Sequence, residues 1–256
     1  MTVTLPLAGL SIVITRPREQ AAGLVQRIEQ LGGKPLLFPL LEIAAVNDDC
    51  TLREQISRLK QTDFAIFISP NAVRYGMEAI RASGDMPASL RIASVGQGSA
   101  KALRELGIKH IIAPTERFDS ESLLALPELQ NVGGKRVMIF RGDGGRELLG
   151  DTLKGRGATV EYVTCYLRSK PDVEVSALLN ALPHAITVTS SEALGHLRET
   201  LDEAQRRVVC AITLIVPHER IAEAARQMGW QQVIVTGSGD DGMMSGLIAW
   251  ANTTRK

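Results

Sequence analysis

Arginines, hydroxyl groups, an amide and glycines gather where the sequence predicts that a buried strand gives way to a helix. Free backbone N–H groups at a helix start, together with guanidinium groups, bind carboxylates and phosphates. Any one such residue is more often a helix cap or a turn, but six strand ends in two related halves favour a shared site. We predict a site for a ligand with several negative charges, formed by Arg16, Ser69, Asn71, Gly96, Ser99, Arg141, Gly142, Gly145, Arg146, Ser190, Ser191 and His218.

One residue is a candidate for proton transfer. Tyr166 is one of three tyrosines and lies near the end of the extended run Thr159–Arg168, where a cleft between two domains would open. A phenol can donate a proton or a hydrogen bond to a departing hydroxyl group. A tyrosine within a strand usually packs against its neighbours, and packing is our interpretation of Tyr162.

The sequence lacks the complete motifs of several common cofactor, metal and catalytic sites. GQGSAK and GDGGRE both begin with Gly-x-Gly, but neither has Gly or Ala at the sixth position, so the dinucleotide fingerprint is incomplete. The four histidines share no metal-ligand spacing. No G-x-S-x-G sequence supports a Ser–His–Asp triad. We therefore expect neither a dinucleotide nor a metal ion.

Strand–turn–helix–strand units must position these residues. The apolar run Arg136–Arg141 precedes a glycine turn, a helical segment with Leu149 and Leu153 on one face, and the extended run Thr159–Arg168. The amino terminus has the same plan, with a strand at Leu10–Thr15 and a helix that ends at two glycines. Further strands are predicted at Phe64–Ser69, Arg91–Gly96 and His110–Pro114.

The chain contains an approximate copy of itself. AITVTSSEAL from Ala185 resembles FAIFISPNAV from Phe64, and roughly 120 residues separate Ser69 from Ser190. Arg16 and Arg141, each at a strand end, are separated by about the same number. Alternating strands and helices favour parallel, doubly wound sheets. We predict two α/β halves of about five strands each.

Two other segments carry structural predictions. Pro39 interrupts the extended run Pro35–Ile43, which argues for an edge strand or a crossing between domains. FDSESLLALPEL predicts a single helix, with Asp119 or Ser120 as its cap.

Composition limits the possible partners. The 256 residues suffice for one large domain or two modest ones, and the net charge of +1 gives no broad field for nucleic acid or a membrane. The three scattered cysteines suggest free, mostly buried thiols in a reducing compartment. The first residues lack a signal peptide, and no apolar run approaches the ~20 residues of a membrane helix. We expect a cytoplasmic monomer.

Six motifs together resemble one family. ITRP, FISPNAV, ASVGQGSAKAL, IFRGDGGRELL, TCYLRSKP and TVTSSEAL are similar, in order and over essentially the whole chain, to uroporphyrinogen-III synthases. The resemblance implies two doubly wound, flavodoxin-like α/β domains joined by a two-stranded linker. Residues 1–38 and 169–256 would form one discontinuous domain, and residues 39–168, with the linker strands, would form the other.

The resemblance also implies a reaction. The family are lyases that close the linear tetrapyrrole hydroxymethylbilane to uroporphyrinogen III, with inversion of ring D and loss of water, in haem, sirohaem and cobalamin biosynthesis. They use no cofactor or metal, and the many substrate carboxylates fit the anion site inferred above. Tyr166 matches the tyrosine thought to assist departure of the hydroxyl group, and Ser69 and Ser99 match hydroxyl positions lining the cleft. Some relatives have threonines where this chain has His218 and Glu219, so no catalytic role is carried over there.

Two alternatives share the fold class. A non-catalytic, two-lobed protein could bind a small polycarboxylate, since architecture alone does not define function. An α/β transferase could use a nucleotide, although the incomplete glycine fingerprints oppose it. Formation of the III isomer of the product would distinguish the synthase from both.

Overall fold

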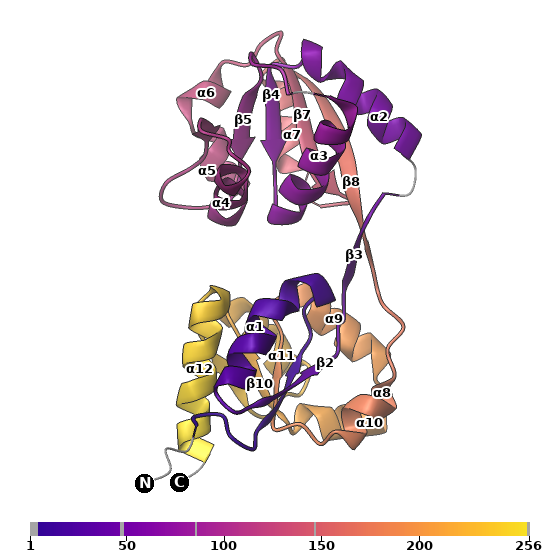
Figure 1. Ribbon diagram of the computed structural model, residues 1–256, viewed down its shortest axis with the longest axis vertical. Helices are drawn as coiled ribbons and strands as arrows, with labels where there is room; N and C mark the ends of the chain where they lie inside the picture. Colours follow the sequence, from indigo (N-terminus) through magenta and orange to yellow (C-terminus); the bar gives the residue numbers. More distant parts are fainter. Residues whose placement is uncertain (1–4, 47–48, 85, 146, 255–256) are drawn as a thin grey trace. The chain divides into compact units, whose positions relative to one another are not determined.

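The computed structural model describes residues 5–46, 49–84, 86–145 and 147–254 (Figure 1). The chain divides into two compact units. The first combines Met1–Glu42 with Ser169–Lys256, and the second is Ile43–Arg168. Within the described ranges, no helix is both long and apolar enough to cross a membrane.

The first unit is built on a five-stranded parallel sheet in the order β11-β10-β9-β1-β2. Its strands are β1 (Ser11–Ile14), β2 (Lys34–Leu37), β9 (Ala185–Thr187), β10 (Thr213–Val216) and β11 (Val233–Val235). Its helices are α1 (Arg18–Gln30), α8 (Val175–Asn180), α9 (Ser191–Thr200), α10 (Glu203–Cys210), α11 (Glu219–Gln227) and α12 (Gly239–Thr254).

Helices cover both faces of this sheet because its central strands are apolar on both sides. Ile12 and Ile14 pack in a core with α1 and α12. Val13, which points the other way, packs in a second core with α8, α9, α10 and α11. Because helices cover both faces of the sheet, a ligand is expected to bind at the carboxyl ends of the strands.

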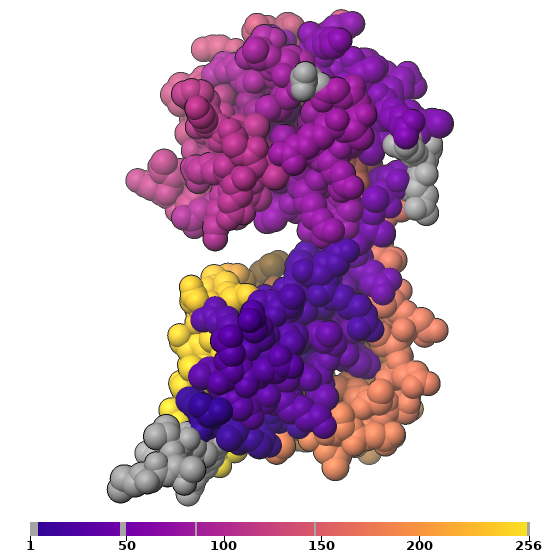
Figure 2. All heavy atoms as spheres, in the orientation of Figure 1, coloured from indigo at the N-terminus to yellow at the C-terminus, as the bar shows by residue number. Residues whose placement is uncertain are grey.

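The second unit has a six-stranded sheet in the order β3-β8-β7-β4-β5-β6. Its strands are β3 (Glu42–Ala45), β4 (Phe64–Phe67), β5 (Arg91–Ser94), β6 (Ile111–Ile112), β7 (Arg136–Gly142) and β8 (Thr159–Ser169). One face packs against α2 (Asp49–Ser57), the 3₁₀ helix η1 (Arg58–Gln61), α3 (Pro70–Ser83) and α4 (Gln97–Glu105). The other packs against α5 (Ser120–Leu124), α6 (Pro127–Gln130) and α7 (Leu148–Gly155). Figure 2 shows the side chains that fill the space between the ribbons within each unit.

The sheet orders confirm the internal repeat. If β1 is equated with β7 and β9 with β4, the order β11-β10-β9-β1-β2 becomes β6-β5-β4-β7-β8, which is the order found in the second unit. The predicted strands at Leu10–Thr15 and Ala185–Ser190 share one sheet, and those at Phe64–Ser69 and Arg136–Arg141 share the other. These two strand pairs are parallel, as the alternating pattern predicts.

Three local predictions need comment. The single helix expected over FDSESLLALPEL is wrong: α5 and α6 are separate, because Leu126 is extended before Pro127, and proline disfavours the helical conformation in the residue before it. The α5 cap is Asp119, whose Oδ1 accepts a hydrogen bond from the Ser122 amide at 2.7 Å. Pro39 separates β2 from β3, as its place in the run Pro35–Ile43 indicates.

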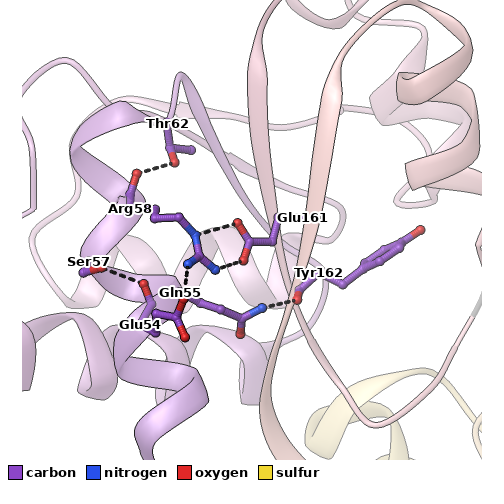
Figure 3. Close-up of polar contacts among 7 residues, drawn as sticks. All are labelled: Glu54, Gln55, Ser57, Arg58, Thr62, Glu161 and Tyr162. Carbon is purple, nitrogen blue, oxygen red and sulfur yellow. Dashed lines mark hydrogen bonds and ion pairs between the residues drawn. The ribbon is translucent and has the colours of Figure 1, made fainter.

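Polar contacts fix β8 against the helices beside it (Figure 3). The Arg58 guanidinium donates two hydrogen bonds to the Glu161 carboxylate, and it also pairs with Glu54 at 3.0 Å. The Gln55 amide donates to the Tyr162 carbonyl at 2.9 Å. These contacts hold the strand on which Tyr166 lies.

Candidate active site

Tyr166 lies near the end of β8, and its side chain has 0% exposure. Its hydroxyl oxygen is 3.1 Å from Ser69 Oγ, and Arg168 Nη2 donates a hydrogen bond to it at 3.1 Å. The Tyr75 ring stacks on the Tyr166 ring at a centroid distance of 5.9 Å. Every member of this network belongs to the second unit. The predicted proton donor is therefore held in place by a hydroxyl group and a guanidinium cation.

Ser69 caps the helix that follows β4. Its Oγ accepts a hydrogen bond from the Ala72 amide at 3.0 Å, and Pro70 occupies the first turn of α3, where its missing N–H has no cost. Ser69 is half-buried, unlike Tyr166. The structure thus joins two predicted site residues in one hydrogen bond and leaves Ser69 as the member nearer the surface.

Gly142 makes room for Tyr166. The pairing of β7 with β8 shifts after Arg141, so that Gly142 lies opposite Tyr166. A Cβ atom at residue 142 would come within 2.6 Å of the Tyr166 ring. The structure therefore shows a packing role for Gly142, which the sequence pattern suggests only as part of an anion-binding turn.

The Arg141 side chain stabilises the glycine turn at residues 142–145. It is only 5% exposed; its Nε donates to the Gly144 carbonyl at 3.1 Å, and its Nη1 pairs with Glu147 at 2.9 Å. Gly145 has φ of +122°, and a Cβ there would be 3.2 Å from Arg141 Nη2. Arg141 thus shapes the turn through its own contacts. The neighbouring predicted residue, Arg146, lies outside the described residues.

The Arg141 guanidinium also lies 4.7 Å from the centre of the Tyr162 ring. Burial, followed by the Glu147 carboxylate, raises the pKa of Tyr162 to about 12. This phenol therefore stays protonated near neutral pH. The packing of Tyr162 among charged groups agrees with the interpretation made from the sequence.

The other predicted residues of the second unit lie at the starts of α3 and α4. Asn71 is half-buried in the first turn of α3, and Gly96 is the N-cap of α4. Ser99 is 1% exposed within α4. A groove of about 430 Å³ between these helices begins at Pro70, next to Ser69, and its lining includes Arg74 and Arg81.

The predicted residues of the first unit lie at three strand ends. The Arg16 guanidinium forms an ion pair with Asp240 in the first turn of α12. Ser190 caps α9, where its Oγ accepts from the Ala193 amide at 3.1 Å, and Ser191 is the first residue of that helix. His218 is exposed before α11, and its side chain makes no cap hydrogen bond. A carboxylate that binds Arg16 would have to compete with Asp240.

Metal-ligating side chains are not clustered among the residues that the structure describes, and of the cysteines, Cys50 is exposed while Cys165 and Cys210 are buried. No three His, Cys, Asp or Glu side chains there are grouped to hold a metal ion. Cys165 is buried, and desolvation raises the pKa of its thiol to about 12, so it remains a neutral packing group.

Sequence reasoning did not identify Arg168 as part of the site. The signal was present, because residues 166 and 168 are two apart on one strand and side chains with that spacing share a face. The missing information was that this face meets the start of α3, a contact that joins segments about 100 residues apart.

The chain is similar to known proteins over most of its length. The sequence profile of uroporphyrinogen-III synthase HemD matches residues 22–244. Uroporphyrinogen-III synthase of Salmonella typhimurium is 36% identical over 238 residues, which cover 91% of this chain and 97% of the relative. The Escherichia coli enzyme is 34% identical with the same coverage.

A solved structure shares the fold. It is a mutant uroporphyrinogen III synthase from the extremely thermophilic bacterium Thermus thermophilus, with a TM-score of 0.66 and 23% identity, and the match covers 96% of this chain and 100% of that one. The fold, the profile and the curated relatives agree. The chain belongs to the uroporphyrinogen-III synthase family.

Proposed function

We propose that this protein closes hydroxymethylbilane to uroporphyrinogen III, with inversion of ring D and loss of water. The observation that carries the proposal is the 36% identity to a curated synthase over 91% of the chain. The network of Tyr166, Ser69 and Arg168 supports it, because the reaction must remove a hydroxyl group. The reaction is that of a lyase.

The reaction begins when the C–O bond of the hydroxymethyl group breaks. Its electron pair stays on oxygen, and the neighbouring pyrrole stabilises the carbon as an azafulvene cation. A proton from the Tyr166 network converts the departing group to water. The substituted carbon of ring D then attacks the cation, and the resulting spiro intermediate fragments and closes again with ring D inverted.

Recognition of the carboxylates would use the starts of helices. The helix dipole favours negative charge at the starts of α3, α4, α9 and α11, and Arg16 adds a guanidinium group. Arg141 would act indirectly by holding the Gly142–Gly145 turn in a conformation whose backbone can approach the ligand. Holding a flexible bilane with its reacting carbons close together would supply much of the acceleration.

The chemistry has a simple set of requirements. Water is lost and no electrons are transferred, so the proposed reaction needs no redox cofactor, and we propose that it uses no metal either. We further propose that the enzyme acts as a monomer in the cytoplasm, where its three thiols would stay reduced.

Product analysis tests the function. A catalytic amount of the protein is added to hydroxymethylbilane, and the products are oxidised to porphyrins and separated by chromatography. The synthase makes many molecules of the III isomer per chain. A non-catalytic polycarboxylate-binding protein would instead bind one bilane and leave it to close to the I isomer without acceleration.

A further inference from the structure

The hydrogen bonds around Tyr166 have one arrangement that satisfies the buried phenol. Arginine has only donors, so the Tyr166 oxygen accepts from Arg168 Nη2. If Ser69 also donated to that oxygen, the phenol proton would need another acceptor, and among the described residues the structure gives it none. A buried donor without a partner costs about 1–3 kcal/mol. The phenol proton therefore points to Ser69 Oγ.

This direction leaves the hydroxyl proton of Ser69 available for a further hydrogen bond. Ser69 Oγ accepts from the Ala72 amide and from the Tyr166 phenol, so its own proton takes part in neither bond. Ser69 is half-buried, whereas Tyr166 has no exposed surface. In this conformation, a substrate at the start of α3 can touch the serine hydroxyl group but cannot touch the phenol.

We propose that Ser69 is the catalytic residue that gives the proton to the departing hydroxyl group, and that Tyr166 and Arg168 are positioning residues that act through it. The inference rests on the proposed function. It names the order of proton transfer: the leaving oxygen takes the Ser69 proton and departs as water, and Ser69 takes the Tyr166 proton. The Arg168 cation stabilises the phenolate that is formed.

The reaction itself returns the proton that Tyr166 gives up. Ring D releases one proton when its new bond to the bridging carbon is made and the pyrrole regains its aromatic ring. That proton returns through Ser69 to the phenolate. The start of α3 also favours transient negative charge on Ser69 Oγ, because the helix dipole and the Ala72 amide face that atom.

A double-mutant cycle tests the relay. Ser69→Ala and Tyr166→Phe are each expected to lower kcat for III-isomer formation by roughly tenfold to hundredfold with little change in KM. This is at or below the ~10²–10⁴-fold contribution of one positioned acid. If both residues serve one proton path, the double variant is no slower than the slower single variant. Arg168→Met, which keeps an unbranched side chain but removes the guanidinium group, should lower kcat by a smaller factor.

Two further variants separate proton transfer from folding. Ser69→Thr keeps the hydroxyl group and should recover most of the lost kcat. Ser69→Asn keeps a good helix cap but has no hydroxyl group, so it should fold like the wild type and remain slow. Ser190→Ala removes the equivalent cap in the first unit and should match the loss of melting temperature in Ser69→Ala.

The outcomes distinguish the possible failures. If Tyr166→Phe is slow while Ser69→Asn and Ser69→Ala turn over at the wild-type rate, the phenol donates directly and the relay is wrong. Multiplied effects in the double variant would also overturn it. If the wild-type protein makes no III isomer at all, the proposed function fails, a result that these variants do not influence.

Discussion

The aromatic ring of Tyr166 rests on the α-carbon of Gly142, where the pairing of β7 with β8 shifts register. Nothing larger than a hydrogen atom fits between them, since a Cβ atom would lie 2.6 Å from the ring. The position of the proposed proton network thus depends on a residue that has no side chain.

Gly142→Ala should therefore cost both stability and turnover. The Tyr166 ring is fully buried and cannot move aside without displacing its neighbours, and overpacking of this kind typically costs ~1–3 kcal/mol. Thermal melts and kcat measure the two effects. Gly155→Ala is the matched control at the end of α7, where an added Cβ meets nothing within 4 Å. Wild-type turnover in Gly142→Ala would show that the ring position does not matter.

Gly150→Ala should destabilise the same unit without involving the site network. A Cβ at residue 150 would lie 1.9 Å from the Tyr162 hydroxyl oxygen and 2.6 Å from the ring carbon that carries it. This clash outweighs the helix-propensity gain of ~1 kcal/mol that alanine usually brings. Removing the oxygen with Tyr162→Phe should restore part of the lost melting temperature in the double variant. If Gly150→Ala melts at or above the wild-type temperature, the packing described here is incorrect.

Asp63 should make the second unit less stable in acid. Hydrogen bonds from the Arg136 amide at 2.9 Å and from Lys135 Nζ at 3.0 Å lower the pKa of its carboxyl group in the folded protein. A lowered folded-state pKa gives stability that is present above the unfolded value of ~3.9 and is lost as pH falls through the folded value.

The test of this linkage is Asp63→Asn, which keeps an acceptor oxygen but never carries a charge. Urea unfolding at a series of pH values should show the variant less stable than the wild type at pH 7. The two should converge as pH falls below ~3.9. A difference in stability that stays constant down to pH 3 would argue against the linkage.

Replacement of Arg16 by alanine and replacement of Arg141 by alanine should have different effects. Arg141→Ala loses partly buried hydrogen bonds to Gly144 and Glu147, so it should lower the melting temperature and loosen the glycine turn. Arg16→Ala should chiefly raise KM, and by a small factor, because Arg16 is already paired with Asp240 and such pairs contribute only ~0.2–1 kcal/mol. Unchanged KM in Arg16→Ala would show that its only role is the ion pair with Asp240.

Much of the fold is readable from local pattern. Continuous apolar runs such as Phe64–Phe67 predict strands buried on both faces, and the repeat with its matching serines at 69 and 190 predicts the common sheet order. The helices α8 and α10 were not predicted, because segments of 6 and 8 residues are too short to show a clear helical period. The break between α5 and α6 depends on one proline.

The site was less readable because its contacts are not local. The strand-end rule identified Ser69 and Tyr166, but the sequence does not show that Tyr166 is fully buried or that Arg168 donates to it. It likewise does not show that Arg141 turns inward, since a guanidinium at a strand end can face either the ligand or its own loop. Charge type is visible in a sequence, whereas side-chain direction depends on the packed neighbours.

Competition with spontaneous closure tests the central claim most directly. Hydroxymethylbilane closes without a catalyst to the I isomer, so the fraction of III isomer can be followed while the amount of folded protein is raised at a fixed bilane concentration. The III isomer should rise toward the whole product as the I isomer falls. If the product remains the I isomer, formed at the spontaneous rate even with one folded chain per bilane, this protein is not a uroporphyrinogen-III synthase.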